Sequence, residues 1–116
     1  MKLKIAVASR GTQGLADEVP EVFGRAKMFT IIEVEDGKIK RVESVENPAA
    51  TYEYGAGPIA IKFLADLGVG VAVGAEFGVG VSTLLADKNI RTVRAPPGTK
   101  VGDVVDKIIR EAVQEG

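Results

Sequence analysis

Residues 54–95 read YGAGPIAIKFLADLGVGVAVGAEFGVGVSTLLADKNIRTVRA, and this stretch decides the fold. Half of the chain's 14 glycines lie between Gly55 and Gly80, where they separate apolar segments. Short, wholly apolar strands that alternate with helices are typical of a buried parallel sheet. The pattern predicts two helices and two strands in alternation: a helix over 58–68, a strand over 69–73, a helix over about 80–87 and a strand over 90–94.

The segments before this stretch predict three further strands. Residues 2–9 alternate and then become wholly apolar, as expected of a central strand. Strands over 28–35 and 38–46 are joined by Asp36-Gly37, a strong signal for a tight hairpin turn. Between the first two strands, residues 10–26 form a long connection that contains several glycines.

The residues after this stretch predict a final helix, capped by Thr99. Its apolar stripe recurs at helical spacing: Val101, Val104, Val105, Ile108, Ile109 and Ala112. The element order is therefore β-β-β-α-β-α-β-α. We expect an α/β fold, a three-layer α/β/α sandwich with a five-stranded mixed sheet of the ribonuclease-H-like kind.

Composition bounds the class of protein. A chain of 116 residues is expected to form a single domain, residues 1–116. The net charge is −1, so the chain lacks the excess of basic residues that is typical of nucleic-acid-binding proteins. No apolar run reaches the length that spans a bilayer, and the first one is too short for a signal peptide. We therefore expect a cytoplasmic protein that binds neither nucleic acid nor a membrane.

Cysteine and histidine are both absent. The chain therefore has no residues for disulfides, thiolate chemistry, the usual zinc sites or histidine acid–base catalysis. A metal bound by side chains alone would need oxygen ligands, or would arrive already coordinated. Only two Asn and two Gln accompany the 15 basic and 16 acidic residues, a balance that favours a thermophilic source.

Two glycine-rich bends, over 54–58 and 74–80, open the two central helices and form the candidate binding site. Backbone N–H groups at a helix start have no partner within the helix and favour negative charge. Two such starts at one edge of a sheet would form an anion-binding pocket. No catalytic or metal-ligating residue is assigned. The candidate binding residues are Arg10, Arg25, Tyr54, Gly55, Gly57, Gly74, Glu76, Gly78 and Gly80.

Each of these residues also has a purely structural interpretation. The guanidinium of Arg25 could reach an anion held by nearby amides, or could pair with a neighbouring carboxylate, and Arg10 has the same two interpretations. Tyr54 could stack on a ligand or pack against the protein. The glycines could serve only tight turns and close packing of helix on sheet. Known phosphate motifs do not match: no Lys follows Gly78 or Gly80, and a dinucleotide fingerprint stops one residue short.

A ribonuclease-H-like fold also admits metal-dependent phosphoryl transfer, which needs clustered carboxylates. The first strand carries no acid. Glu33 and Glu35 lie on the second strand and Glu76 in the second glycine bend, with no evident partner. This enzyme remains an alternative.

Several short motifs follow one another in a definite order: Phe23-Gly24-Arg25, a hairpin, Asn47, a Gly-x-Gly before a helix, and a glycine turn before a second helix. In this order and spacing the chain resembles the dinitrogenase iron–molybdenum cofactor biosynthesis family, the nitrogenase accessory factor-like proteins, from Lys2 to Ala112. The resemblance implies the same sandwich fold. It also implies a small carrier of iron–sulfur or iron–molybdenum cofactor precursors, although many members have roles outside nitrogen fixation.

Members of that family that carry clusters are expected to use His or Cys near these loops, and this chain has neither. What the resemblance implies here is outer-sphere binding of an anionic cluster by backbone amides, with Arg10 or Arg25 adding charge. The leading hypothesis is a non-enzymatic protein that binds a small anion or a metal cluster. A protein-interaction or regulatory module without a ligand is the alternative. The charged strand over 38–46 opposes pairing with a second copy, so we expect a monomer or a weak homodimer.

Overall fold

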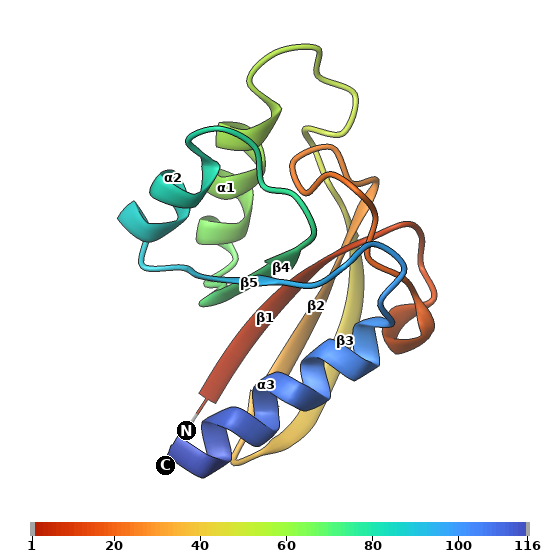
Figure 1. The fold of residues 1–116 in the computed structure, drawn as a ribbon, viewed down its shortest axis with the longest axis vertical. Coiled ribbons are helices and arrows are strands. Elements are labelled where there is room, and N and C mark those ends of the chain that lie inside the picture. Colours follow the sequence, from red (N-terminus) through yellow and green to blue (C-terminus); the bar gives the residue numbers. More distant parts are fainter. Residues whose placement is uncertain (1, 116) are drawn as a thin grey trace.

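The computed structural model describes residues 2–115 and shows an α/β fold with a five-stranded mixed sheet (Figure 1). The strands are β1 (Lys2–Ser9), β2 (Met28–Glu35), β3 (Lys38–Glu46), β4 (Val71–Gly74) and β5 (Arg91–Arg94). The helices are η1 (Gly14–Ala16), α1 (Ala56–Asp66), α2 (Val81–Asp87) and α3 (Val101–Glu115). The predicted order of elements is confirmed, and η1 is a short 3-10 turn inside the long connection after β1.

The strand order across the sheet is β3-β2-β1-β4-β5. β2 pairs antiparallel with both β1 and β3, whereas β4 pairs parallel with β1 and with β5. Four strands therefore run in one direction, and β1, β3, β4 and β5 all end at the same edge of the sheet. We call this the carboxyl edge. The connections that leave it lead into α1, α2 and α3, so all three helices begin there.

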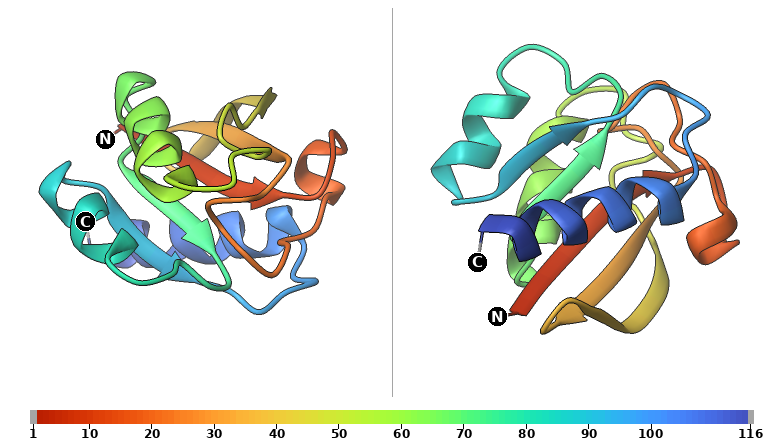
Figure 2. Two further views of the ribbon diagram at one scale, coloured as in Figure 1. Left: turned by 90° about the horizontal axis from the view of Figure 1, so that it is seen from above. Right: turned by 60° about the horizontal axis from the view of Figure 1, so that its bottom comes forward.

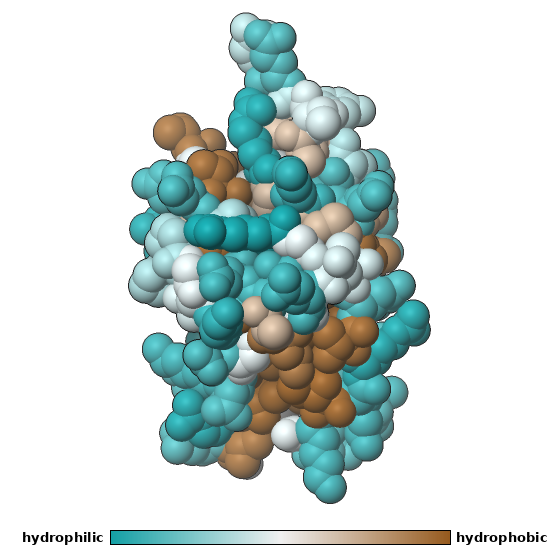
Figure 3. All heavy atoms as spheres, turned by 90° about the vertical axis from the view of Figure 1, so that its right-hand side faces the viewer, coloured by the Kyte–Doolittle hydropathy of each residue, from teal (hydrophilic) through white to brown (hydrophobic). Residues whose placement is uncertain are grey.

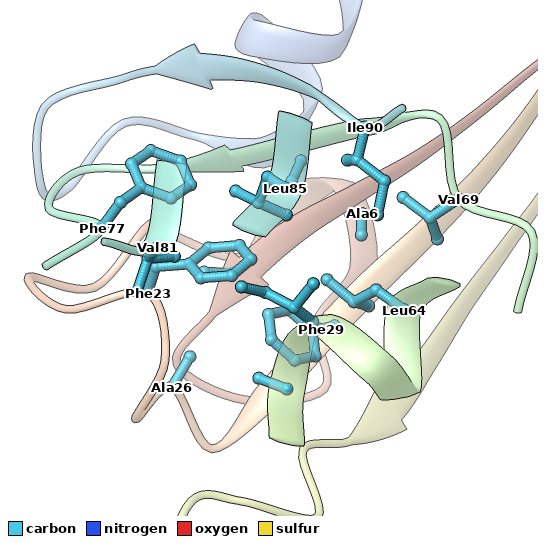
Figure 4. Close-up of a cluster of buried hydrophobic side chains, with 14 of the residues drawn as sticks. Ala6, Phe23, Ala26, Phe29, Leu64, Val69, Phe77, Val81, Leu85 and Ile90 are labelled. Atoms are coloured by element: carbon cyan, nitrogen blue, oxygen red, sulfur yellow. The ribbon is translucent and has the colours of Figure 1, made fainter. Parts of the chain in front are cut away.

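The helices cover both faces of the sheet, and each face has its own apolar core (Figure 2). α1 and α2 cover one face, over a core that includes Phe29, Leu64 and Leu85 (Figure 4). α3 covers the other face and packs Val101 and Val105 against residues of β1, β2 and β4. The predicted apolar stripe of the last helix therefore faces the sheet along most of its length. No helix within residues 2–115 is long and apolar enough to cross a membrane.

The β2–β3 hairpin turns at Asp36 and Gly37, whose φ angles are 53° and 78°. Both angles lie in the left-handed region that primed hairpin turns require, so this prediction is confirmed. β3 is an edge strand, also as predicted. The pairing of β3 with β2 slips by one residue beside Lys40, because Arg41 pairs with Glu33 but Ile39 pairs with Val34.

Three details differ from the sequence prediction. α1 begins at Ala56 rather than at Pro58, because Gly55 adopts a left-handed conformation (φ 74°) and serves as the N-cap. β4 extends to Gly74 and starts two residues later than expected. The prediction that Thr99 caps α3 is wrong. The helix starts at Val101, and the Thr99 hydroxyl instead donates to the Pro96 carbonyl, 2.7 Å away, in the preceding turn.

Candidate functional site

The two glycine bends lie side by side at the carboxyl edge, where α1 and α2 begin. Gly55 is the N-cap of α1 and Gly80 the N-cap of α2, with φ angles of 74° and 79°. The two starts touch: a methyl group added at Gly57 would lie 2.9 Å from Cγ2 of Val81. The structure therefore brings the two bends together, as the alternation of strands and helices predicted.

Packed side chains nevertheless fill the space that the sequence suggested as a pocket. Gly57 lies between Val81 and the turn at Gly24, and a methyl group at Gly24 would come within 3.4 Å of the Gly57 nitrogen. A methyl group at Gly74 would lie 2.9 Å from the ring of Phe23. Phe23 in turn packs against Phe77, with ring centroids 4.7 Å apart (Figure 4). Gly57 and Gly74 therefore serve close packing, which corrects the prediction that they line an open pocket.

Five exposed residues of the two bends form the surface that we call the glycine shelf: Tyr54, Gly55, Gly78, Val79 and Gly80. A methyl group at Gly55 or Gly80 would meet no atom within 4 Å, so both positions face open space. The Tyr54 side chain is 82% exposed. Neither α1 nor α2 has an acidic residue in its first turn or a side chain that caps it. The shelf therefore has open backbone at two helix starts and carries no carboxylate of its own.

Arg25 holds the loop that leads into this shelf. Its Nη1 donates to the Tyr52 carbonyl at 2.6 Å, and its Nη2 donates to the Glu53 carbonyl at 2.7 Å. Sequence reasoning offered an anion or a carboxylate as the partner, whereas the structure shows two backbone carbonyls. The positive charge of Arg25 is thereby fixed next to Tyr54.

Asn47 links the same loop to the Phe23-Gly24-Arg25 turn. Its Nδ2 donates to the carbonyls of Gly24 and Ala26, at 3.0 and 2.9 Å, and its Oδ1 accepts the N–H of Ala49 at 2.9 Å. The side chain is buried, and all its polar atoms are paired. Sequence reasoning used Asn47 only as a family marker and missed this role. The signal was present, because an Asn directly after a strand commonly bonds the backbone two residues on.

Arg10 lies apart from the shelf, on the α3 side of the sheet. Its guanidinium is 3.8 Å from the Glu18 carboxylate, which also pairs with Lys100 at 3.1 Å. Lys100 immediately precedes α3, so these three side chains tie the loop after β1 to that helix. The structure therefore separates Arg10 from the other predicted binding residues.

The neighbouring Asp17 organises this loop, a role that the sequence did not reveal. Its buried carboxylate accepts N–H groups from Arg10, Gly11, Gln13 and Glu18, at 2.8 to 3.3 Å. Burial raises the pKa of Asp17, but the backbone donors outweigh burial, and the net pKa is lower than the ordinary value. Asp17 is therefore a structural anion that fixes the loop at the carboxyl end of β1.

Glu76 lies beside the shelf, and its backbone is already paired. Its N–H donates to the Glu21 carbonyl, and its carbonyl accepts the N–H of Phe23. The Glu76 side chain is exposed and helps to line an open hollow together with Glu21 and Arg94. This hollow contains two acids and one base, so it offers no marked preference for anions.

The side chains of this chain do not fit inner-sphere coordination of a metal cluster. The sequence has no Cys or His, and residues 2–115 contain no group of three or more acidic residues that could hold a metal ion. Glu35, at the end of β2, lies at the opposite edge of the sheet from Glu76, because β2 runs against β1 and β4. The remaining way to hold a cluster is outer-sphere contact with a cargo that brings its own ligands.

Comparison with known proteins gives consistent matches. A family model described as dinitrogenase iron-molybdenum cofactor matches residues 1–111. The apo form of the orange protein from Desulfovibrio gigas is 28% identical and has a TM-score of 0.83, with 93% of this chain and 88% of that chain covered. A NifB-like protein from Thermotoga is 27% identical with a TM-score of 0.68, covering 98% and 89%. An uncharacterized protein of Methanocaldococcus jannaschii is 36% identical over 56 residues, about half the length of that relative (48% of each chain).

Proposed function

Because the chain belongs to the dinitrogenase iron-molybdenum cofactor family, we propose that it is a small non-enzymatic carrier of an anionic metal-cluster precursor or a similar small anion. The glycine shelf is the proposed binding surface. The physiological role need not involve nitrogen fixation. A ribonuclease-H-like classification of the fold and a cytoplasmic location are parts of the same proposal.

The observation that carries this proposal is the start of α1. Gly55 leaves the helix without a side-chain cap, and no acid occupies its first turn. The first N–H groups of a helix have no partner within it and carry the positive end of the helix dipole. At most helix starts a Ser, Thr, Asp or Asn side chain satisfies one of these donors. Because Pro58 has no N–H and the Ile59 N–H donates to the Gly55 carbonyl, the donors that we propose for an external acceptor are the N–H groups of Ala56 and Gly57.

The chemistry of such a site is limited to positioning. A cluster that carries its own sulfide or thiolate ligands is an anion, and the shelf offers it backbone N–H groups and the fixed charge of Arg25. The exposed ring of Tyr54 adds a flat apolar surface beside it. Because no side chain bonds to the metal, the cargo can be released without breaking a coordination bond. Weak, reversible binding suits a carrier that passes its cargo to another protein.

Binding is tested by titrating the purified protein, without oxygen, with a soluble anionic iron–sulfur cluster and separately with inorganic phosphate. Pro58→Glu places a carboxylate in the first turn of α1, where it suits the helix dipole but competes with an anion. Ala86→Glu makes the same change in charge at the far end of α2 and is the matched control. We expect saturable binding that Pro58→Glu abolishes and Ala86→Glu preserves. The proposal is contradicted if neither the cluster nor phosphate binds saturably. It is also contradicted if Pro58→Glu and Ala86→Glu bind the same probe equally well.

A second comparison isolates the contribution of charge. Arg25→Ala removes the cation beside the shelf, whereas Arg10→Ala removes a cation from the α3 side of the sheet. Carrier function predicts that only Arg25→Ala weakens binding of the cluster. A similar loss in both variants would indicate non-specific attraction to the protein's charge.

A protein-interaction module is the second candidate function. It is favoured by the exposed side chains of Val79 and Tyr54, one in each glycine bend, because exposed apolar and aromatic side chains can anchor a partner protein. The absorption spectrum of protein purified without oxygen separates the two functions, since a bound iron–sulfur species absorbs visible light. A colourless protein that elutes with a stoichiometric partner, and loses it in Val79→Lys, supports the module instead. Metal-dependent phosphoryl transfer is the enzymatic alternative, and turnover of phosphate esters with Mg²⁺ or Mn²⁺ would support it.

A further inference from the structure

β3 is a long edge strand at the side of the sheet, and η1 contacts it beside Val42, where a methyl group added at Gly14 would lie 3.5 Å from Cγ1 of Val42. The strand order leaves β3 with a neighbour on one side only, and it is nine residues long. β5, at the other edge, has only four residues. An edge strand presents unpaired N–H and C=O groups that can pair with another strand. β3 is therefore the natural place for sheet pairing with a second protein.

The irregularity beside Lys40 gives this strand an apolar side. Val42 pairs with Ile32 and Ile39 pairs with Val34, so both face the α3 side of the sheet despite their odd spacing. Without the extra residue, Ile39 and Val42 would lie on opposite faces. They are 39% and 38% exposed. Figure 3 views the molecule from the side on which β3 lies in Figure 1, and an apolar area is visible low on that side.

The charges of β3 are complementary to those of a second β3 in one antiparallel register. Opposed residues of such a pair lie on the same face, so the two-fold axis must pass through a residue of the regular segment 41–46. An axis at Arg41, Glu43 or Glu46 opposes like charges, an axis at Ser44 opposes Val42 with a carboxylate, and an axis at Val45 opposes Ser44 with Glu46 and gives no pair of opposite charges. An axis at Val42 opposes Val42 with itself and sets Arg41 against Glu43 on both sides. This register alone gives two attractive pairs around an apolar contact.

We infer that two copies of this chain pair antiparallel along β3, with the two-fold axis at Val42, to form one continuous ten-stranded sheet. Within one copy, Arg41 already lies 3.2 Å from Glu43 and 3.8 Å from Glu33 on the same face, so the charged groups stand where the second copy would meet them. The charges that oppose random edge pairing thus favour one partner. An isologous contact of this kind closes on itself and does not propagate into fibres.

Charge reversal tests this dimer in the full chain by analytical ultracentrifugation over a dilution series. Arg41→Glu sets a glutamate of each copy against Glu43 of the other copy, and Glu43→Arg sets an arginine of each copy against Arg41 of the other. Each variant alone is expected to raise the dimer Kd about tenfold or more, because two attractive cross-strand pairs become repulsive. An equimolar mixture of the two variants restores both opposite-charge pairs and is expected to recover the dimer. The chain that carries both substitutions is also expected to dimerise, because its glutamate at 41 would face the arginine at 43 of the other copy.

Lys62→Glu is the control, because it reverses an exposed charge on α1 and breaks its pair with Asp66 without touching β3. Its dimer Kd is expected to equal that of the wild type. Circular dichroism checks that each variant folds, which is expected because the ion pairs of Arg41 are exposed and contribute little to stability. A wild type that is monomeric at every concentration overturns the inference. So does a mixture of the two charge-reversed variants that stays monomeric.

Discussion

The Gly57 Cα faces the Val81 side chain so closely that a methyl group added at Gly57 would lie 2.9 Å from Cγ2 of Val81. This contact joins the first turns of α1 and α2 and places the two glycine bends next to each other. Real Cβ atoms essentially never approach another heavy atom so closely. The glycine at this position is therefore required by the neighbouring helix, whatever the shelf binds.

Gly57→Ala is expected to lower the free energy of unfolding by about 1–3 kcal/mol, the usual cost of overpacking. Val81→Ala removes two buried methyl groups and should cost about 2 kcal/mol. In the double variant the added methyl occupies space that Val81 vacates, so the loss should be smaller than the sum of the single losses by about 1 kcal/mol or more. Urea denaturation of the four proteins measures this coupling. Strict additivity would show that the contact does not limit the packing.

Asn47 should be among the most sensitive polar positions in residues 2–115, because three backbone groups from two loops depend on it. Asn47→Ala leaves buried acceptors and a donor unpaired, and we expect a loss of about 3 kcal/mol or more. Asn47→Asp should cost at least as much, because it sets a carboxylate oxygen against the Gly24 and Ala26 carbonyls. Thermal unfolding measures both. Ser44→Ala, at a half-buried position of β3, is the control and should stay within about 0.5 kcal/mol of the wild type.

The lowered pKa of the Asp17 carboxyl predicts that the protein loses stability in acid. Its pKa in the folded protein lies below the ordinary value of 3.8, because its backbone donors favour the charged form. The stabilisation from the carboxylate is therefore complete above pH 3.8 and is lost as the pH falls through the folded pKa. Asp17→Asn should cost about 1.5–3 kcal/mol at pH 7, since it removes hydrogen bonds to a charged group.

The measurement is the free energy of unfolding of wild type and Asp17→Asn across an acid pH series. The difference between the two proteins should shrink as the pH falls below 3.8, because the wild-type carboxyl is then protonated as well. Asp106→Asn, at an exposed ion pair on α3, is the control and should show little difference at any pH. If the free energies of unfolding of wild type and Asp17→Asn differ by the same amount at every pH, the effect of the substitution does not come from titration of the carboxyl group.

Much of this architecture could be predicted from the periodicity of the sequence. The filling of the space between the two glycine bends by packed side chains could not. The glycine-rich bends over 54–58 and 74–80 predicted two helix starts, and the alternation of strands and helices predicted that both starts share one edge. The same pattern could not show whether a ligand or a side chain occupies the space above Gly74. That depends on Phe23, which reaches the site from a distant loop. Arg25 is similar, because its partners are carbonyls 27 and 28 residues away that carry no sequence signal.

Arg25 therefore yields a prediction about motion more than about stability. Its two hydrogen bonds hold the loop that ends at Tyr54, and they are exposed to solvent. Arg25→Lys keeps the charge but cannot bond two carbonyls in the same fork geometry. We expect the free energy of unfolding to change by less than about 0.5 kcal/mol, as for most surface positions. Amide hydrogen exchange over residues 51–55 should nevertheless accelerate, because local opening no longer breaks both bonds. Arg10→Lys should leave that segment unchanged, since Arg10 lies on the other face of the sheet.

If residues 51–55 exchange at the same rate in wild type, Arg25→Lys and Arg10→Lys, the two hydrogen bonds of Arg25 do not order the loop. Arg25 would then contribute only its charge to the shelf.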